Sequence, residues 1–268
     1  MMPARFIPFH DTLAPEAAMP QVFEPESMPA ILRRPPVDLE VIIPAYNEER
    51  RISDTIAATV SYLGDKNWSS AVVVVDNDSA DGTLDVTSRF GGTHVPVHVI
   101  GCSDHGKGAA VRRGIMTSSA HFLGFVDADN ATPVETLDRI MPLLVDGRAA
   151  AVIASRRATG AIYEIEQSLG RRFGTWLFHH LAPPEVRSIA DTQCGFKFFN
   201  GPLIREIAQT CHVDGFAFDV ELLCRLAQRH LPVVELPVAW SDMPGSTFSA
   251  RRDGLRSMAD LLRLSYSG

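Results

Sequence analysis

The chain has 268 residues, of which 46% are hydrophobic and 21% are charged, as in soluble globular proteins with one large or two small domains. Its formal net charge of −7 argues against nucleic-acid binding, which requires a basic surface. No run approaches the roughly 20 apolar residues that span a bilayer, and no signal-peptide pattern begins the chain. The four cysteines form no CxxC motif, so we expect a reduced, cytoplasmic setting rather than a disulfide framework or zinc site.

Residues 1–37 contain many prolines and no sustained periodicity, which predicts a flexible or loosely docked N-terminal arm. From residue 38 onward, short apolar runs alternate with segments of helical period. The predicted strands lie at residues 39–44, 71–76, 95–100, 121–127 and 149–155, and the predicted helices at 48–63, 81–90, 108–119 and 133–145. This alternation predicts an α/β fold with a mostly parallel central sheet flanked by helices on both faces.

The alternation loosens after residue 156. Residues 160–194 form a long predicted connection with a helical patch. Further strands are predicted at 196–199 and 233–240, and helices at 201–209 and 217–230. A C-terminal amphipathic helix is predicted over residues 254–264.

Two carboxylates follow the predicted strand at 121–127, in the sequence Asp127-Ala128-Asp129. Alternating carboxylates at a strand end can hold Mg²⁺ or Mn²⁺ that bridges a diphosphate. A solvated acidic turn, or a cap for the helix that begins near Pro133, explains them equally well.

Other polar residues follow neighbouring strands, and ligands of parallel α/β sheets bind beyond the carboxyl ends of the strands. Asp76 can accept the imide N–H of a pyrimidine or the N–H groups of guanine. Tyr46 can flank a base, and Glu48 can hold a ribose or base donor. The alternative is a helix start with Asn47 as cap and acidic residues favoured by the helix dipole.

The stretch at residues 101–108, GCSDHGKG, nearly matches a P-loop. Gly108 stands where the magnesium-binding hydroxyl is required, and the stretch follows the third strand, so we reject a P-loop NTPase. Lys107 can still meet phosphate or base oxygens at a helix N-terminus.

The second half carries further charged residues. Asp191 and Gln193 read as a polar turn, and Asp219 as a dipole-favoured acid at a helix start, unless they serve a site. Arg171 and Arg172, which suit phosphate binding, lie in an aromatic segment that reads as a core-facing or a membrane-edge helix.

The ordered motifs IIPAYNEE, VDNDSADGT, GKGAAVRRG, VDADN and SRR resemble those of family 2 glycosyltransferases with a GT-A fold. The second-half motifs resemble the dolichyl-phosphate β-glucosyltransferase and polyprenyl-phosphate glycosyltransferase branch; they include DTQCGFKFF, FAFDVELL and LPVVELPVAW. The resemblance implies a single GT-A domain over residues 38–268. Its Rossmann-like nucleotide-sugar half would be 38–156, and its acceptor half 157–268.

The resemblance also implies roles for individual positions. Nucleotide binding falls to Pro44, Ala45, Tyr46, Glu48 and Asp76, with Lys107 near the base and phosphates. Asp127 and Asp129, on either side of Ala128, would carry the metal. Basic positions near the donor and acceptor phosphates are Arg156, Arg171 and Arg172, and the sugar–acceptor side has Asp191, Gln193 and Asp219.

The resulting hypothesis is an inverting, Mg²⁺- or Mn²⁺-dependent transfer of a hexose, preferably from UDP-glucose with GDP-mannose as alternative, to a polyprenyl or dolichyl phosphate. A phosphate acceptor needs positive charge rather than a base, whereas a hydroxyl acceptor needs a general base, for which Asp219 and then Asp191 are candidates. The polar residues 1–36 favour the alternative of a soluble GT-A enzyme with a small-molecule hydroxyl acceptor. Peripheral contact with the cytoplasmic membrane face stays open, as do a binding module without turnover and a nucleotidyltransferase.

Overall fold

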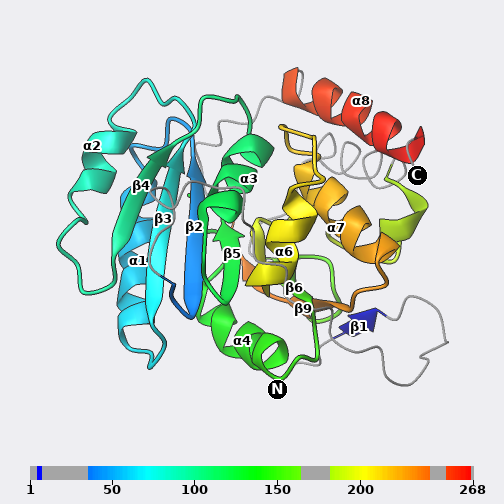
Figure 1. Ribbon diagram of the computed structural model, residues 1–268, viewed down its shortest axis with the longest axis horizontal. Coiled ribbons are helices and arrows are strands. Elements are labelled where there is room, and N and C mark those ends of the chain that lie inside the picture. Colours follow the sequence, from blue (N-terminus) through cyan, green and yellow to red (C-terminus); the bar gives the residue numbers. More distant parts are fainter. Residues whose placement is uncertain (1–4, 8–35, 164–181, 242–251, 267–268) are drawn as a thin grey trace.

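The computed structural model describes residues 5–7, 36–163, 182–241 and 252–266 (Figure 1). Within them, one sheet has the strand order β1-β9-β6-β8-β5-β2-β3-β4. In that order the strands are β1 (Arg5–Ile7), β9 (Val233–Pro237), β6 (Ala151–Ser155), β8 (Phe196–Asn200), β5 (Phe122–Val126), β2 (Leu39–Ala45), β3 (Ser70–Asp76) and β4 (Val97–Gly101). β8 is antiparallel to β5 and β6, and β1 to β9, while the other neighbours are parallel. The predicted mostly parallel α/β fold is confirmed.

The central strands are buried on both faces, which explains their continuous apolar runs. Every residue of β3 is buried. In β2, Val41 and Ile43 belong to the core on one face and Ile42 to the core on the other, as the two-residue period of a strand requires. Each such side chain contributes about 1.5–3 kcal/mol by leaving water.

Helices cover both faces of the sheet (Figure 1). One core includes residues of α3 (Lys107–Thr117), α6 (Gly201–Ala208), α7 (Phe218–Gln228) and α8 (Arg252–Tyr266). The other core includes residues of α1 (Ile52–Gly64) and α4 (Leu137–Val145), with α2 (Thr83–Ser88) packed beside it. None of the helices in the described ranges is long and apolar enough to cross a bilayer.

Several observed elements differ from the expectations. The helix expected over 133–145 starts as the short 3₁₀ helix η2 (Val134–Thr136) and continues as α4, and a second 3₁₀ turn, η3 (Pro184–Val186), precedes β8. The strand expected over 233–240 is divided into β9 and β10 (Ala239–Trp240). β9 ends at Pro237, because proline has no backbone N–H to donate to a neighbouring strand. β10 then lies outside the main sheet and pairs with β7 (Ile162–Tyr163). β1, in the N-terminal arm, pairs with β9 and was not expected from the sequence.

Candidate active site

The strand register brings three polar loops to one edge of the sheet. Ala45 at the end of β2 pairs with Asp76 at the end of β3, and Ile42 pairs with Phe125 of β5. Asp76 and Asp127 therefore follow the strands on either side of β2, about two strand spacings or roughly 10 Å apart. This edge is where parallel α/β proteins bind ligands.

Asp76 has a carboxylate oxygen without a partner. Its side chain is only 6% exposed, and Oδ2 accepts a 3.3 Å hydrogen bond from the backbone N–H of Ser79. Oδ1 is buried and accepts no hydrogen bond from the protein. Because buried polar atoms are nearly always satisfied, this oxygen points to a ligand donor.

Asn77 takes a different role from its neighbour. Its Nδ2 donates to the carbonyls of Cys102 and Asp104 at 3.2 and 2.6 Å, and its Oδ1 accepts from the N–H of Gly106 at 2.8 Å. An aspartate at this position could not make these two donations, because an ionised carboxylate has no hydrogen to donate. The amide therefore fastens the loop that leads into Lys107.

Glu48 and Arg51 form an ion pair at the start of α1. Nε and Nη2 of Arg51 donate to the two oxygens of Glu48 at 2.8 and 2.6 Å, and Glu48 is 8% exposed. Burial raises the pKa of Glu48 despite this guanidinium. Tyr46 is 45% exposed on the same loop, which leaves its ring accessible to a base.

Both carboxylates of the Asp127-Ala128-Asp129 turn face a protein cation. Nζ of Lys107 lies 2.8 Å from Oδ1 of Asp127, and Nη1 of Arg51 lies 3.9 Å from Oδ2 of Asp129. The two aspartate side chains remain 41% and 25% exposed, so a ligand can reach them. Although burial lowers the pKa of Lys107, the charges of Asp127 and Asp219 raise it above its ordinary value.

Gly195 explains how Asp127 fits against β8. A Cβ at Gly195 would lie 2.0 Å from the Asp127 carboxylate, so only glycine permits this approach. The backbone N–H of Asp127 also donates to the carbonyl of Gly195 at 2.8 Å. The two predicted halves of the domain therefore meet at the carboxylate turn.

A cavity of about 140 Å³ adjoins this turn. Its lining includes Asp127, Asp129, Thr55, Thr132, Arg156 and Trp240. The Arg156 guanidinium lies 5.5 Å from the centre of the Trp240 ring, within cation–π range. The volume is below the roughly 300–1,000 Å³ of pockets that enclose drug-sized ligands, so the cavity can enclose only part of a ligand of that size.

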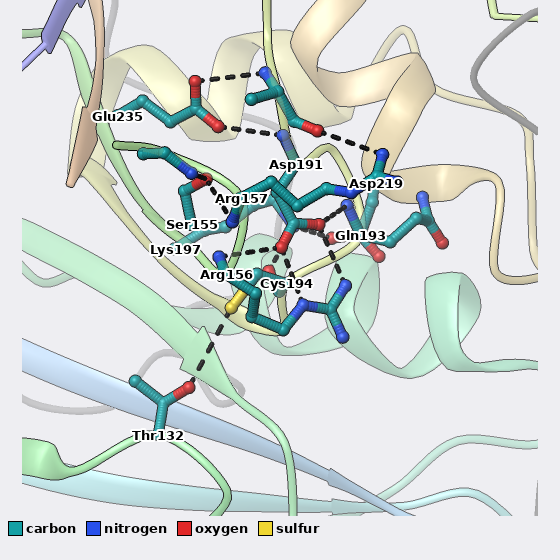
Figure 2. Close-up of polar contacts among 12 residues, drawn as sticks. Thr132, Ser155, Arg156, Arg157, Asp191, Gln193, Cys194, Lys197, Asp219 and Glu235 are labelled. Carbon is teal, nitrogen blue, oxygen red and sulfur yellow. Dashed lines mark hydrogen bonds and ion pairs between the residues drawn. The ribbon is translucent and has the colours of Figure 1, made fainter. Parts of the chain in front are cut away.

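Asp191 is held by several donors, among them Arg156, which lines this cavity (Figure 2). Nε and Nη2 of Arg156 donate to its two oxygens at 2.7 and 2.9 Å, and the Arg156 N–H adds a bond of 3.0 Å. Burial raises the pKa of Asp191, but the charge and hydrogen bonds of Arg156 outweigh it and lower the pKa to about 2. Glu235, fully buried, in turn accepts from the N–H groups of Asp191 and Ala190 at 2.8 and 3.1 Å.

Asp219 lies between two ammonium groups. Nζ of Lys197, a fully buried residue of β8, is 2.5 Å from its Oδ1, and Nζ of Lys107 is 3.7 Å from its Oδ2. Lys197 also donates to the carbonyl of Cys194 at 2.6 Å. Lys107 thus bridges Asp127, which follows β5, and Asp219 of α7 through one cation.

The remaining candidates are placed as follows. Gln193 lies beside Asp191, and its buried Nε2 has no hydrogen-bond partner. Pro44, Ala45 and Ala128 line the carboxyl edge through their backbone, with the last two buried. Arg171 and Arg172 lie outside the described residues. All four cysteines are buried and free, as expected.

Three charged residues of the site were missed in the sequence. Arg51 follows Glu48 at a helical spacing of three, a pattern that suggests an ion pair. Lys197 and Glu235 interrupt the apolar runs FKFF and VVELP. A charge inside a buried strand requires a buried partner, so both interruptions were detectable signals.

Comparison with known proteins agrees with this geometry. Residues 40–199 match glycosyl transferase family 2. The chain is 32% identical to the dolichyl-phosphate beta-glucosyltransferases of Drosophila melanogaster and Homo sapiens, over 91% and 90% of this chain and 79% of each relative.

Among solved structures, two of glucosyl-3-phosphoglycerate synthase from Mycobacterium tuberculosis share the fold. The complex with Mn²⁺, UDP-glucose and phosphoglyceric acid gives a TM-score of 0.64 at 20% identity, covering 86% of this chain and 80% of that one. The complex with Mg²⁺ and UDP gives 0.63 at 20% identity, covering 85% and 79%. The chain therefore belongs to glycosyl transferase family 2 and is a glycosyltransferase with the GT-A fold.

Proposed function

We propose that the chain transfers glucose, with inversion, from UDP-glucose to a polyprenyl phosphate of the dolichyl phosphate type. The relatives named dolichyl-phosphate beta-glucosyltransferase support the acceptor and the sugar. UDP-glucose in the Mycobacterium tuberculosis structure of the same fold supports the donor. Within the site, the unpartnered Oδ1 of Asp76 suits the imide N–H of uracil, and the exposed Tyr46 ring suits its flat face.

The main support for a phosphate acceptor, rather than a hydroxyl acceptor, is that both candidate bases form ion pairs within the protein. Asp219 is buried against Lys197 and Lys107, and Asp191 against Arg156. Both oxygens of each carboxylate already face these cations, so neither carboxylate is free to take a proton from an acceptor hydroxyl. We therefore assign Asp219 and Asp191 as positioning residues rather than general bases.

A phosphate acceptor does not need such a base. Its second pKa is about 6, so it is largely dianionic at neutral pH. One of its oxygens attacks C1 of glucose while the bond from C1 to the diphosphate oxygen breaks and its electron pair stays on UDP. Lys107 and Arg156 are the described cations best placed to stabilise the added charge near the carboxylate turn and the cavity.

Divalent metal fits Asp127 and Asp129 in part. Carboxylate oxygens are the ligands that Mg²⁺ and Mn²⁺ prefer, and both side chains are accessible. The part of the chain that the structure describes holds no cluster of three or more His, Cys, Asp or Glu for a metal. The two aspartates would hold the ion together with diphosphate oxygens, and when bound it would neutralise the leaving diphosphate.

The acceptor is tested with a matched pair of lipids. We expect release of UDP from UDP-glucose with polyprenyl phosphate and not with the polyprenol of the same chain length. GDP-mannose in place of UDP-glucose checks the donor. Equal turnover with the alcohol, or none with the phosphate, would contradict the proposal.

Metal use is tested by direct binding of Mn²⁺. Electron paramagnetic resonance should report weak Mn²⁺ binding to the protein alone and tighter binding with UDP. Lys107→Met should strengthen Mn²⁺ binding in the absence of UDP, because it removes the cation that occupies Asp127. Lys66→Met, which removes an exposed ion pair with Asp138, is the matched control. Mn²⁺ binding that UDP does not change would contradict joint binding.

A further inference from the structure

The outward face of α8 combines apolar and cationic side chains. Of residues 254–265, the exposed ones are Leu255, Arg256, Ala259, Leu262, Arg263 and Ser265, with no carboxylate among them. Leu255 is 68% and Leu262 45% exposed, and their spacing of seven places them on one side of the helix. This face stands out in a chain whose net charge is −7.

The opposite face of α8 attaches the helix to the domain. Leu261 is fully buried in the core that also contains residues of α3, α6 and α7, and Ser257 is 3% exposed. Asp260 is 14% exposed and lies 3.6 Å from Arg263, whose side chain remains 82% exposed. One stripe of α8 is thus packed, while its leucines and arginines face solvent.

We infer that the exposed face of α8 binds an anionic lipid surface, with Leu255 and Leu262 entering the interface and Arg256 and Arg263 contacting headgroup phosphates. Amphipathic helices that lie in a membrane interface combine these features. A symmetric contact with a second copy would place these arginines against one another, whereas anionic headgroups attract them, which favours a lipid surface. The purpose of the contact rests on the proposed function, since a polyprenyl phosphate acceptor resides in a membrane.

The position of α8 connects this surface with the active site. A Cβ at Gly215 would lie 3.7 Å from Oδ2 of Asp260, so α8 packs on the segment that precedes α7. That segment packs in turn on the start of α3, where Ala109 N–H donates to the carbonyl of Asp214 at 3.0 Å. Lys107 lies at this same helix start. A membrane against the exposed face of α8 would therefore bring lipid headgroups toward the proposed acceptor side of the site.

Vesicle flotation of the full chain tests the inference. We expect binding to vesicles of phosphatidylcholine with phosphatidylglycerol and weaker binding to phosphatidylcholine alone, and high salt should reduce the first to the level of the second. Arg256→Gln with Arg263→Gln should weaken partitioning about 25-fold, from roughly fivefold per arginine at an anionic surface. Leu255→Gln with Leu262→Gln should weaken binding to both kinds of vesicle.

The helix α2 offers a matched control. Leu84 is 45% exposed, as is Leu262, and Arg89 is also exposed, but Asp85 beside them is exposed and acidic. Leu84→Gln with Arg89→Gln should leave vesicle binding unchanged. Thermal unfolding of each variant checks that it folds.

The results separate this inference from the proposed function. The inference would be overturned if the wild type and the α8 variants partitioned equally to vesicles. It would also be overturned if the wild type self-associated and only the α8 variants lost this self-association. Transfer to detergent-solubilised polyprenyl phosphate should be the same in all variants. If the wild type binds vesicles but transfers glucose to no polyprenyl phosphate, the proposed function fails while the lipid surface stands.

Discussion

Asp76 and Asp219 are both buried carboxylates at the same site, but they lie in opposite electrostatic surroundings. Asp76, at the end of β3, has a buried oxygen with no partner in the protein. Asp219, at the start of α7, contacts Lys197 at 2.5 Å and Lys107 at 3.7 Å. The end of β3 therefore keeps a polar group free for a ligand, whereas the acid at the start of α7 holds two cations in place.

The comparison teaches that pairing, not residue type or burial, decides what a carboxylate can do. An unpaired buried oxygen costs free energy until a ligand donor satisfies it. A paired one is already satisfied and contributes to the arrangement of its partners. The following experiments test this contrast in order of decreasing expected effect.

Lys197→Met should destabilise the protein most, by about 3–5 kcal/mol, because it removes a partner from the buried Asp219. Urea unfolding measures the loss. Replacing both partners, Lys197→Met with Asp219→Leu, should recover much of the lost stability, because the buried carboxylate that would lack Lys197 is then removed as well. A loss below about 1 kcal/mol in the single variant would show that the pair is not a buried structural element.

Asp76→Asn should weaken UDP binding by about 1.5–3 kcal/mol, roughly 10- to 150-fold, because a charge-assisted hydrogen bond to the base is lost. Folding stability should change little, since Oδ1 has no partner in the protein. Isothermal titration calorimetry and thermal unfolding measure the two effects. An unchanged affinity for UDP would remove Asp76 from the nucleotide site.

Acid should remove the contribution of Asp191. Its folded-state pKa of about 2 lies below the ordinary 3.8, so its stabilising effect is present above about pH 4 and is lost as the pH falls toward 2. The shift corresponds to about 2 kcal/mol. Urea unfolding across this range should give a shallower pH dependence for Asp191→Asn than for the wild type, and identical slopes would contradict the assignment.

The exposed pair of Arg229 and Glu206 should give the smallest effect. Its distance of 2.8 Å resembles that of the buried pairs, but its side chains are 37% and 54% exposed. Arg229→Met should therefore cost less than about 1 kcal/mol in urea unfolding. A loss as large as that of Lys197→Met would show that burial does not separate the two classes of pair.

Much of the candidate site at the ends of β2, β3 and β5 could be predicted from the sequence, because the order of these elements follows local rules. Apolar runs located β2, β3 and β5, and the parallel arrangement placed the residues after them at one edge. Asp76 and Asp127 could therefore be assigned to one site. Whether their carboxylate oxygens are paired with other residues could not be predicted. Asp127 proved to be paired with Lys107 and Asp76 proved to have a free oxygen.

The ion pairs of Asp191 and Asp219 were harder to predict because the paired residues are distant in sequence. Lys197 and Asp219 are 22 residues apart, and Arg156 and Asp191 are 35 apart. Antiparallel β8, inserted between β5 and β6, brings these pairs together, and no spacing rule specifies that insertion. The sequence therefore offered Asp219 as a candidate base, while its ion pairs favour a positioning role.

The sequence by itself determined the fold class, the edge that carries the site and the residue types available there, because strand period and family motifs are local properties of the chain. Only the tertiary structure decided which acids are paired, which polar atoms stay free and which face of α8 meets solvent. Those properties depend on distances of a few ångströms between residues far apart in the chain, over which charge pairing and desolvation act.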